Sequence, residues 1–296
     1  MKFGQTNPQN YLKLKLASIR QKYWPLIKSL QTGLLLITGL AGYMSSRCPV
    51  SHIPTLLSLT GSLFLAISGS TVLNMWFDRD IDAIMERSKK RPLPSGLIQA
   101  EEALKLGLAL SVLGVGWALI LDPLYGAIVF AGLFFDVIVY TVWLKRRTAW
   151  SIVWGGISGG MPILAGRALG MGQLDWIGIA LAASVLFWIP THIMTFNIRY
   201  LDDYNRATVP TFASRYGVDT TRKIIAASSI LATIFMSLSS YGVGLTIGYS
   251  RILALLSGGL LILALYSAIK PSEKLNFGLF KFASIYMLSS MLLISA

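Results

Sequence analysis

Four polar residues recur at four-residue intervals where the second apolar stretch of the chain ends: Asn74, Asp78, Asp82 and Glu86. On one continuous helix they would form a single polar stripe, and like charges at this spacing oppose helix formation unless cations offset them. Carboxylate and amide oxygens suit Mg²⁺, which proteins usually hold with one or two carboxylates together with substrate phosphates. The spacing therefore predicts a Mg²⁺–diphosphate site. The alternative is a solvated helix end whose acids pair with neighbouring basic residues, namely Arg79, Arg87 and Lys89.

Basic residues flank this stripe. The run RSKKR at 87–91 follows it directly, and a second run, 145–147, closes the fourth apolar stretch just after Tyr140. Guanidinium groups bind phosphate in a bidentate manner, and an aromatic face attracts positive charge, so Tyr140 could stabilise an allylic cation. Simple membrane anchoring is the alternative. The candidates for diphosphate contact are Lys28, Arg87, Arg91, Lys145, Arg146 and Arg199.

A second polar motif begins inside the sixth apolar stretch. Pro190 interrupts the helical hydrogen-bond pattern there, and His192 and Asn197 lie at membrane depth, where polar groups are usually functional. Asp202 and Asp203 follow and could bind a second Mg²⁺. For His192 the alternative is a packing role, and for the two acids it is pairing with Arg199 and Arg206.

The elements that must position these residues are apolar helices. Of 296 residues, 54% are hydrophobic and 13% are charged, which excludes a disordered chain and argues against a soluble enzyme. Cys48 is the only cysteine, which excludes a disulfide scaffold. We therefore expect an all-α polytopic membrane protein, with residues 1–24 as a cytoplasmic amphipathic arm and 25–296 as a single domain. Its nine transmembrane helices are predicted at 25–45, 53–76, 101–120, 122–143, 151–169, 175–197, 222–246, 251–269 and 277–296.

The basic residues divide unevenly between the loops. One set of alternate loops holds only Arg47, Arg167 and Arg251, whereas the N-terminal arm and the other set hold nearly all the rest. The positive-inside rule then places the N-terminus in the cytoplasm of a multi-pass protein of the cell membrane. Membrane orientation and an anionic substrate account for the formal charge of +13, so no nucleic-acid partner is needed.

At these motifs the chain resembles the UbiA superfamily of intramembrane prenyltransferases, and within it the haem O synthase branch. The resemblance lies in NMWFDRDIDAIMERSKKRPLPSG (74–96), YTVWLKRRT (140–148), GGISGGMPILAG (155–166) and WIPTHIMTFNIRYLDDYNRATVP (188–210). It implies a nine-helix fold with a cytoplasm-facing cavity, and Mg²⁺ and diphosphate binding by Asn74, Asp78 and Asp82. In the second superfamily motif, Asp-x-x-x-Asp, Asp203 matches the second acid and Arg199 replaces the first. The haem branch shares that replacement and a His where His192 stands.

The resemblance implies farnesyl transfer from farnesyl diphosphate to the vinyl group of haem B, with Mg²⁺ as cofactor and His192 orienting the haem. It also suggests contact with membrane lipid and with a haem A synthase or a terminal oxidase assembly protein. The branch usually reads Pro-Pro-His-Phe and Val-Pro-Met-Leu-Pro, where this chain has PTHI (190–193) and VPTFA (209–213). These changes fall in the part of the chain that is expected to bind the acceptor. A lipid or a quinone ring therefore remains an alternative acceptor. A transporter is the alternative from another class.

Overall fold

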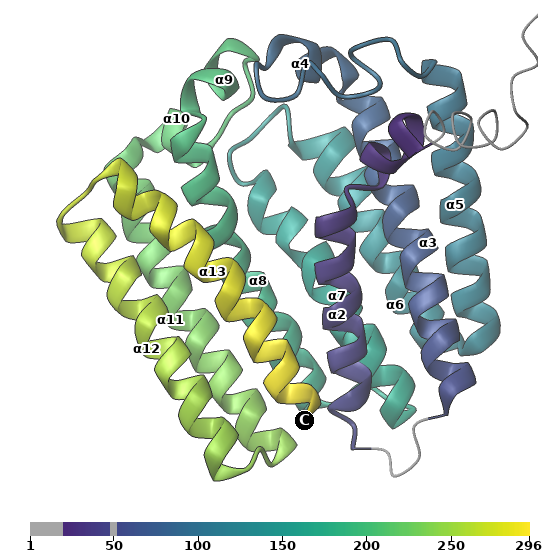
Figure 1. Cartoon of the computed structure of the whole chain (residues 1–296), viewed down its shortest axis with the longest axis vertical. Coiled ribbons are helices and arrows are strands. Elements are labelled where there is room, and N and C mark those ends of the chain that lie inside the picture. The colour runs from purple at the N-terminus through teal and green to yellow at the C-terminus, as the bar shows by residue number, and fades with distance from the viewer. Residues whose placement is uncertain (1–19, 48–51) are drawn as a thin grey trace, which may run out of the picture.

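The computed structural model describes residues 20–47 and 52–296, and this part of the chain is helical without strands. Figure 1 shows long helices running side by side between two ends of the molecule. Of the predicted N-terminal arm, only residues 20–24 lie within the described part.

The long helices follow the predicted apolar stretches, and α6 continues into η2, a π-helix. They are α2 (Ser29–Met44), α3 (Ile53–Phe77), α5 (Ala100–Leu121), α6 (Pro123–Phe134), η2 (Phe135–Leu144), α7 (Ser151–Met171), α8 (Trp176–Arg199), α11 (Val218–Val243), α12 (Ile247–Ile269) and α13 (Glu273–Ser295). Four short elements lie together at one end of the bundle (Figure 1): η1 (Trp24–Ile27), α4 (Arg79–Ile84), α9 (Leu201–Arg206) and α10 (Phe212–Tyr216).

Seven helices in the described part, with α6 and η2 taken as one, are long and apolar enough to cross a membrane. The two predicted spans that fall outside this group are α2 and α7. Helix α2 has only 16 residues, because Lys28 takes a left-handed backbone conformation (φ 44°) that separates it from η1. Helix α7 is long enough, but its glycines and Arg167 lower its apolar character. The multi-pass, all-helical fold is therefore confirmed with seven clear span candidates.

Glycines allow α7 to pack tightly between the two halves of the bundle. A Cβ built on Gly42 of α2 would lie 2.1 Å from the backbone oxygen of Ile163, and one on Gly166 would lie 1.9 Å from that of Gly39. Small residues permit such close helix approach in membranes. One buried hydrophobic cluster unites α7 with α8 and α11–α13, and another unites it with α2, α3, α5 and α6.

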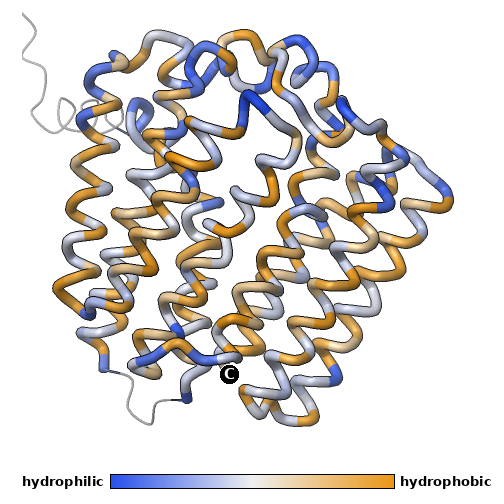
Figure 2. The backbone as a smooth tube through the Cα atoms, turned by 180° about the vertical axis from the view of Figure 1, so that it is seen from behind, coloured by the Kyte–Doolittle hydropathy of each residue, from blue (hydrophilic) through white to orange (hydrophobic). Residues whose placement is uncertain are grey.

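Arginines tie the loops at the end opposite the short helices. The Arg167 guanidinium pairs with Asp175 at 2.6 Å and donates to the backbone oxygen of Ser45 at 2.7 Å. Arg47 donates to the backbone oxygen of Val243 at 2.9 Å, near the end of α11. Figure 2 shows hydrophobic residues along the helices and hydrophilic residues gathered mainly toward their ends. Two of the three basic residues in these sparsely charged loops therefore have a structural role.

Candidate active site

The first acidic motif lies where α3 meets α4. Helix α3 ends at Phe77, yet the N–H of Asp78 still donates to the oxygen of Asn74 (3.0 Å), and that of Asp82 to the oxygen of Asp78 (2.8 Å). The four-residue spacing thus continues through the bend, and Asn74, Asp78 and Asp82 are all buried. Glu86 does not extend the stripe, because α4 ends at Ile84 and Glu86 is exposed and paired with Lys89. The prediction of a fourth member was wrong.

Cations from three other parts of the chain meet this stripe. The Lys145 ammonium pairs with the Asp78 carboxylate, and Arg91 pairs with Asp82 at 2.7 Å. Lys28 donates to the amide oxygen of Asn74 at 3.4 Å. Each polar group of the stripe is therefore paired with a basic side chain from the predicted diphosphate set, not with the Arg79, Arg87 and Lys89 of the alternative interpretation.

Arg146 lies at the rim of the same cluster. It forms a bidentate pair with the exposed Asp80 (2.6 and 2.7 Å), and its guanidinium is 3.9 Å from Oδ1 of Asp78. Hydrogen bonding to Arg146 lowers the pKa of the Asp80 carboxyl. Burial by itself would lower the pKa of Lys145, but the neighbouring Tyr140 and Asp78 raise it, so Lys145 is charged at neutral pH.

A network of polar side chains, which the sequence did not predict, contacts the Asn74 side chain of the stripe. The Asn74 amide donates to the Thr141 hydroxyl (2.7 Å), which donates to the backbone oxygen of Asp136 (2.7 Å), five residues earlier in η2. Ser70 of α3 donates to the Asp136 carboxylate. The π-helical turn suits this five-residue spacing, and such turns are frequent at functional sites. The intramembrane Asp136 was the available signal, since such residues usually have a partner or a function.

Tyr140 lies between this network and α7. A Cβ built on Gly155 would be 2.8 Å from the Tyr140 ring, so the glycine gives the ring its place. The Lys145 ammonium is 5.6 Å from the ring centroid. The predicted cation-stabilising aromatic ring therefore lies next to the cation that pairs with Asp78.

The second acidic motif holds two loops together. The Asp203 carboxylate accepts the backbone N–H groups of Glu86 and Arg87 at 3.3 Å each, and it pairs with Arg206. Burial acts to raise the pKa of Asp203, but these donors together lower it. Asp202 is exposed. Within residues 20–47 and 52–296, no three His, Cys, Asp or Glu side chains form a metal-binding group.

Arg87 stands beside Asp203 rather than beside Asp78. Its guanidinium donates to the Tyr204 hydroxyl at 3.1 Å and lies 5.1 Å from the rings of Phe196 and Tyr204. Its Nε is buried without a hydrogen-bond partner. The structure thus gives Arg87 an aromatic surrounding with unused hydrogen-bonding capacity.

The two basic candidates on α8 face a different helix. The Arg199 guanidinium lies 3.9 Å from the centroid of Phe277 on α13. His192 is stacked between Trp188 (4.9 Å) and Phe280 (4.6 Å), and its Nδ1 is 3.2 Å from the Ser284 hydroxyl of α13. The structure therefore does not bring Arg199 and His192 into contact with the stripe.

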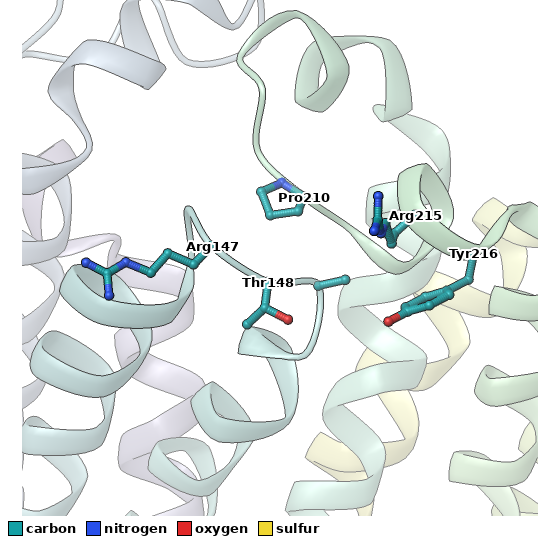
Figure 3. A pocket seen from close by; sticks show the side chains of 6 residues that line it. Arg147, Thr148, Pro210, Arg215 and Tyr216 are labelled. Atoms are coloured by element: carbon teal, nitrogen blue, oxygen red, sulfur yellow. The ribbon is translucent and has the colours of Figure 1, made fainter.

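Two adjoining cavities lie near the loop after η2, and one of them is lined by Lys145. The inner one, of about 40 Å³, is lined in part by Tyr140, Lys145, Asn197 and Tyr204. The outer one, of about 450 Å³, appears in Figure 3. Its lining residues are Arg147, Thr148, Ala149, Pro210, Arg215 and Tyr216. Ala149 and Pro210 line both, so the cavities are neighbours.

Similar proteins agree on one enzyme family. A protoheme IX farnesyltransferase of Korarchaeum cryptofilum is 42% identical over 213 residues, covering 72% of each chain. Protoheme IX farnesyltransferase 1 of Pyrobaculum aerophilum is 34% identical over 263 residues, covering 88% of this chain and 94% of its own.

Solved structures show the same fold. A UbiA homologue of Archaeoglobus fulgidus bound to GPP and Mg²⁺ superposes with a TM-score of 0.69 at 14% identity, covering 93% of this chain and 100% of that one. A structure described as that of digeranylgeranylglyceryl phosphate synthase superposes with a TM-score of 0.76 at 21% identity, covering 95% and 97%. The UbiA prenyltransferase family model matches residues 35–285, and this chain belongs to that family.

Proposed function

We propose that this protein transfers a farnesyl group from farnesyl diphosphate to the vinyl group of haem B, giving haem O and diphosphate. The observation that carries the proposal is that the buried polar groups of the first motif are each paired with a partly buried basic residue, namely Lys145, Arg91 or Lys28. The names of the relatives at 34–42% identity support the donor and the acceptor.

The donor set of the first motif fits Mg²⁺. Oδ1 of Asp78 is buried and has no hydrogen-bond partner, so it has a free lone pair for a metal or for a metal-bound water. Asn74 and Asp82 add an amide and a carboxylate on the same side of the helix end. When bound, Mg²⁺ would neutralise charge on the diphosphate leaving group. We assign Asp202 and Asp203 to a second ion, for which Asp203 would have to release Arg206 or one of the backbone N–H groups that its carboxylate accepts.

The basic side chains would then exchange partners. In the proposal, Lys145 and Arg91 turn from their carboxylates to the diphosphate, with Lys28 and Arg146 beside them and Arg87 at the α8–α9 side. Arg199, which stacks on Phe277 of α13, stays outside this group. The group holds the negative charge that develops on oxygen as the C1–O bond of the allylic donor breaks. The face of Tyr140 lies beside the carbon that becomes positive.

The acceptor side of the proposal rests on His192. Its Nδ1 is used by Ser284, and Nε2 has no hydrogen-bond partner among the described residues, so Nε2 is available to bind haem iron or a haem substituent. Stacking between Trp188 and Phe280 fixes the ring plane. A haem A synthase or an oxidase assembly protein is the partner proposed to take the product.

We further propose nine spans within one domain, 25–296, with the N-terminus and the short helices on the cytoplasmic side of the cell membrane. Support comes from the basic runs at the end that carries α4, α9 and α10. The test is cysteine labelling in a Cys48→Ser background. A cysteine at Lys270 should react with a membrane-impermeant maleimide only in opened cells, and one at Arg251 in intact cells; the reverse pattern contradicts the orientation.

The function is tested with purified protein, haem B, farnesyl diphosphate and Mg²⁺. Mass spectrometry of the extracted haem should show the farnesyl-hydroxyethyl adduct, together with diphosphate release. Asp78→Asn and Asp82→Asn should abolish both, whereas Asp219→Asn, which changes an exposed acid paired with Arg222, should not. Unmodified haem alongside prenylation of a lipid or of a quinone precursor would contradict the haem assignment.

A further inference from the structure

Three polar contacts in a row join α3 to η2 and to the residue that ends it. Each contact uses one side chain from either side, and the pairs are Ser70 with Asp136, Asn74 with Thr141, and Asp78 with Lys145. Along α3 the contacting residues are four apart, which keeps them on one side of an α-helix. Along the partner segment the steps are five and then four residues.

The π-helical form of η2 is what allows this row. Asp136 and Lys145 are nine residues apart, which in an α-helix makes about two and a half turns, so the two side chains would point to opposite sides. Hydrogen bonds between residues five apart, such as that from the Lys145 N–H to the Tyr140 oxygen (2.8 Å), put more residues in each turn. Thr141, the middle member, is thereby turned toward Asn74 together with its two neighbours in the row.

The Thr141 hydroxyl accepts, and does not donate, in its contact with Asn74. Its single hydrogen is donated to the backbone oxygen of Asp136 at 2.7 Å, and a carbonyl oxygen can only accept. The lone pairs of the hydroxyl are left for the Asn74 amide, and only the NH₂ end of that amide can use them. Thr141 is completely buried and Asn74 is 8% exposed, so water has little access to this contact.

The orientation of the amide decides which atom of Asn74 faces the basic side chains. With its NH₂ group at Thr141, the amide presents Oδ1 to Lys28, which donates to it at 3.4 Å. A flipped amide would present a donor to that cation instead of an acceptor. It would also offer no oxygen to Mg²⁺, which binds oxygen ligands.

We infer that Thr141 is a positioning residue that fixes the Asn74 amide so that its oxygen is available to the magnesium complex of the donor. This inference rests on the proposed function, because it takes Asn74 as a ligand of Mg²⁺ or of a metal-bound water. Thr141 contacts neither metal nor substrate in this arrangement and acts only through Asn74. Partners that orient a metal ligand in this way typically contribute roughly 10–100-fold to metal affinity.

The test measures metal binding separately from turnover. Mn²⁺ is titrated into the full-length protein with farnesyl diphosphate and without haem, and free Mn²⁺ is followed by electron paramagnetic resonance. Thr141→Val keeps the shape of the side chain without its hydroxyl and should weaken Mn²⁺ binding by roughly 10–100-fold. Thr141→Ser keeps the hydroxyl and should bind Mn²⁺ almost as the original does. In prenyl-transfer assays, the Mg²⁺ concentration that gives half the maximal rate should rise in Thr141→Val, with the KM for haem B unchanged.

Tyr125→Phe is the matched control. It removes a completely buried hydroxyl that is 2.8 Å from the Ser62 hydroxyl and joins the same two helices, α3 and the continuous α6–η2. Ser62 lies about three turns before Asn74 in α3, well away from the acidic stripe. This variant should lose stability only, with the Mn²⁺ affinity of the original.

Three results would overturn the inference: an unchanged Mn²⁺ affinity in Thr141→Val, an equal loss in Thr141→Ser, or an equal loss in Tyr125→Phe. Thr141→Ala replaces the valine variant if that variant does not fold, with the same loss expected and the same refutation. If the unsubstituted protein binds no Mn²⁺ with farnesyl diphosphate, the assignment of the first motif to Mg²⁺ fails and the inference fails with it. Mn²⁺ binding that depends on Thr141, without any haem product, would instead contradict the proposed acceptor and support the inference.

Discussion

Replacing Lys145 with Met removes the counter-charge of a buried carboxylate. The side chains of Asp78 and Lys145 are 2% and 16% exposed, so their pair lies almost entirely out of water. Breaking a buried pair by removing one partner destabilises a protein by about 3–5 kcal/mol. We expect the lower end, about 3 kcal/mol, because Arg146 remains 3.9 Å from Asp78. At roughly 2 °C per kcal/mol, the melting temperature should fall by about 6 °C.

Removing both charges should restore stability without restoring activity. In the double variant Lys145→Met, Asp78→Asn, neither partner is left charged, and we expect the free energy of unfolding to return to within about 1 kcal/mol of the original. Prenyl transfer should stay at least about a thousandfold lower, since the groups that hold the leaving diphosphate are gone. Lys105→Met is the matched control. It breaks a pair with Glu101 that is 74% exposed on both sides, and it should change stability by less than about 0.5 kcal/mol.

Thermal unfolding in detergent, followed by tryptophan fluorescence, and initial rates of diphosphate release measure the two effects separately. Melting-temperature losses that add in the double variant would refute the coupling of the two side chains. A double variant that recovers both stability and turnover would refute the assignment of the pair to the active site.

Three further substitutions test other parts of the structure. Gly155→Val should lower kcat more than tenfold by displacing the Tyr140 ring, with the KM for farnesyl diphosphate little changed in steady-state assays. Arg167→Met should leave the Asp175 carboxylate unpaired and lower the melting temperature by several degrees, while turnover per folded molecule is unchanged. Because the folded-state pKa of Asp203 is lowered, its contribution to stability is present above the unfolded pKa of about 3.9 and is lost as pH falls through the folded value. Asp203→Asn should therefore melt lower than the original at pH 7, with the difference shrinking below about pH 4.

Local patterns predicted the helices and the acidic stripe. Apolar length and i, i+4 spacing depend on neighbours in sequence, so Asn74, Asp78 and Asp82 share one side as expected. The partner of Asp78 was not predictable by the same means. Lys145 lies 67 residues away and reaches it because η2 packs against α3, and only tertiary structure decides that Arg146 pairs chiefly with Asp80 instead.

The second motif shows where periodicity fails. Arg199 and Asp203 are four residues apart and would share a face on one helix, but α8 ends at Arg199 and Tyr200 leaves the helical conformation (φ −111°, ψ 31°). Asp203 therefore points to the loop after α4, while Arg199 stacks on Phe277 of α13. The replacement of an acid by Arg199 in this motif is thus compatible with a role at the α8–α13 contact.

The ion pairs of the first motif affect how the site would bind its prenyl diphosphate donor. Lys145, Arg91 and Lys28 exceed the carboxylates of Asp78 and Asp82 by one positive charge. Before any ligand binds, Lys145 pairs with Asp78, Arg91 pairs with Asp82, and Lys28 donates to Asn74. A magnesium complex of a prenyl diphosphate carries net negative charge, so its binding would replace one set of ion pairs by another with little charge left unbalanced out of water. The same cations then become more strongly bound as the C1–O bond breaks, because negative charge on the leaving group rises at that moment. Preformed pairs of this kind hold the cations in place for the transition state.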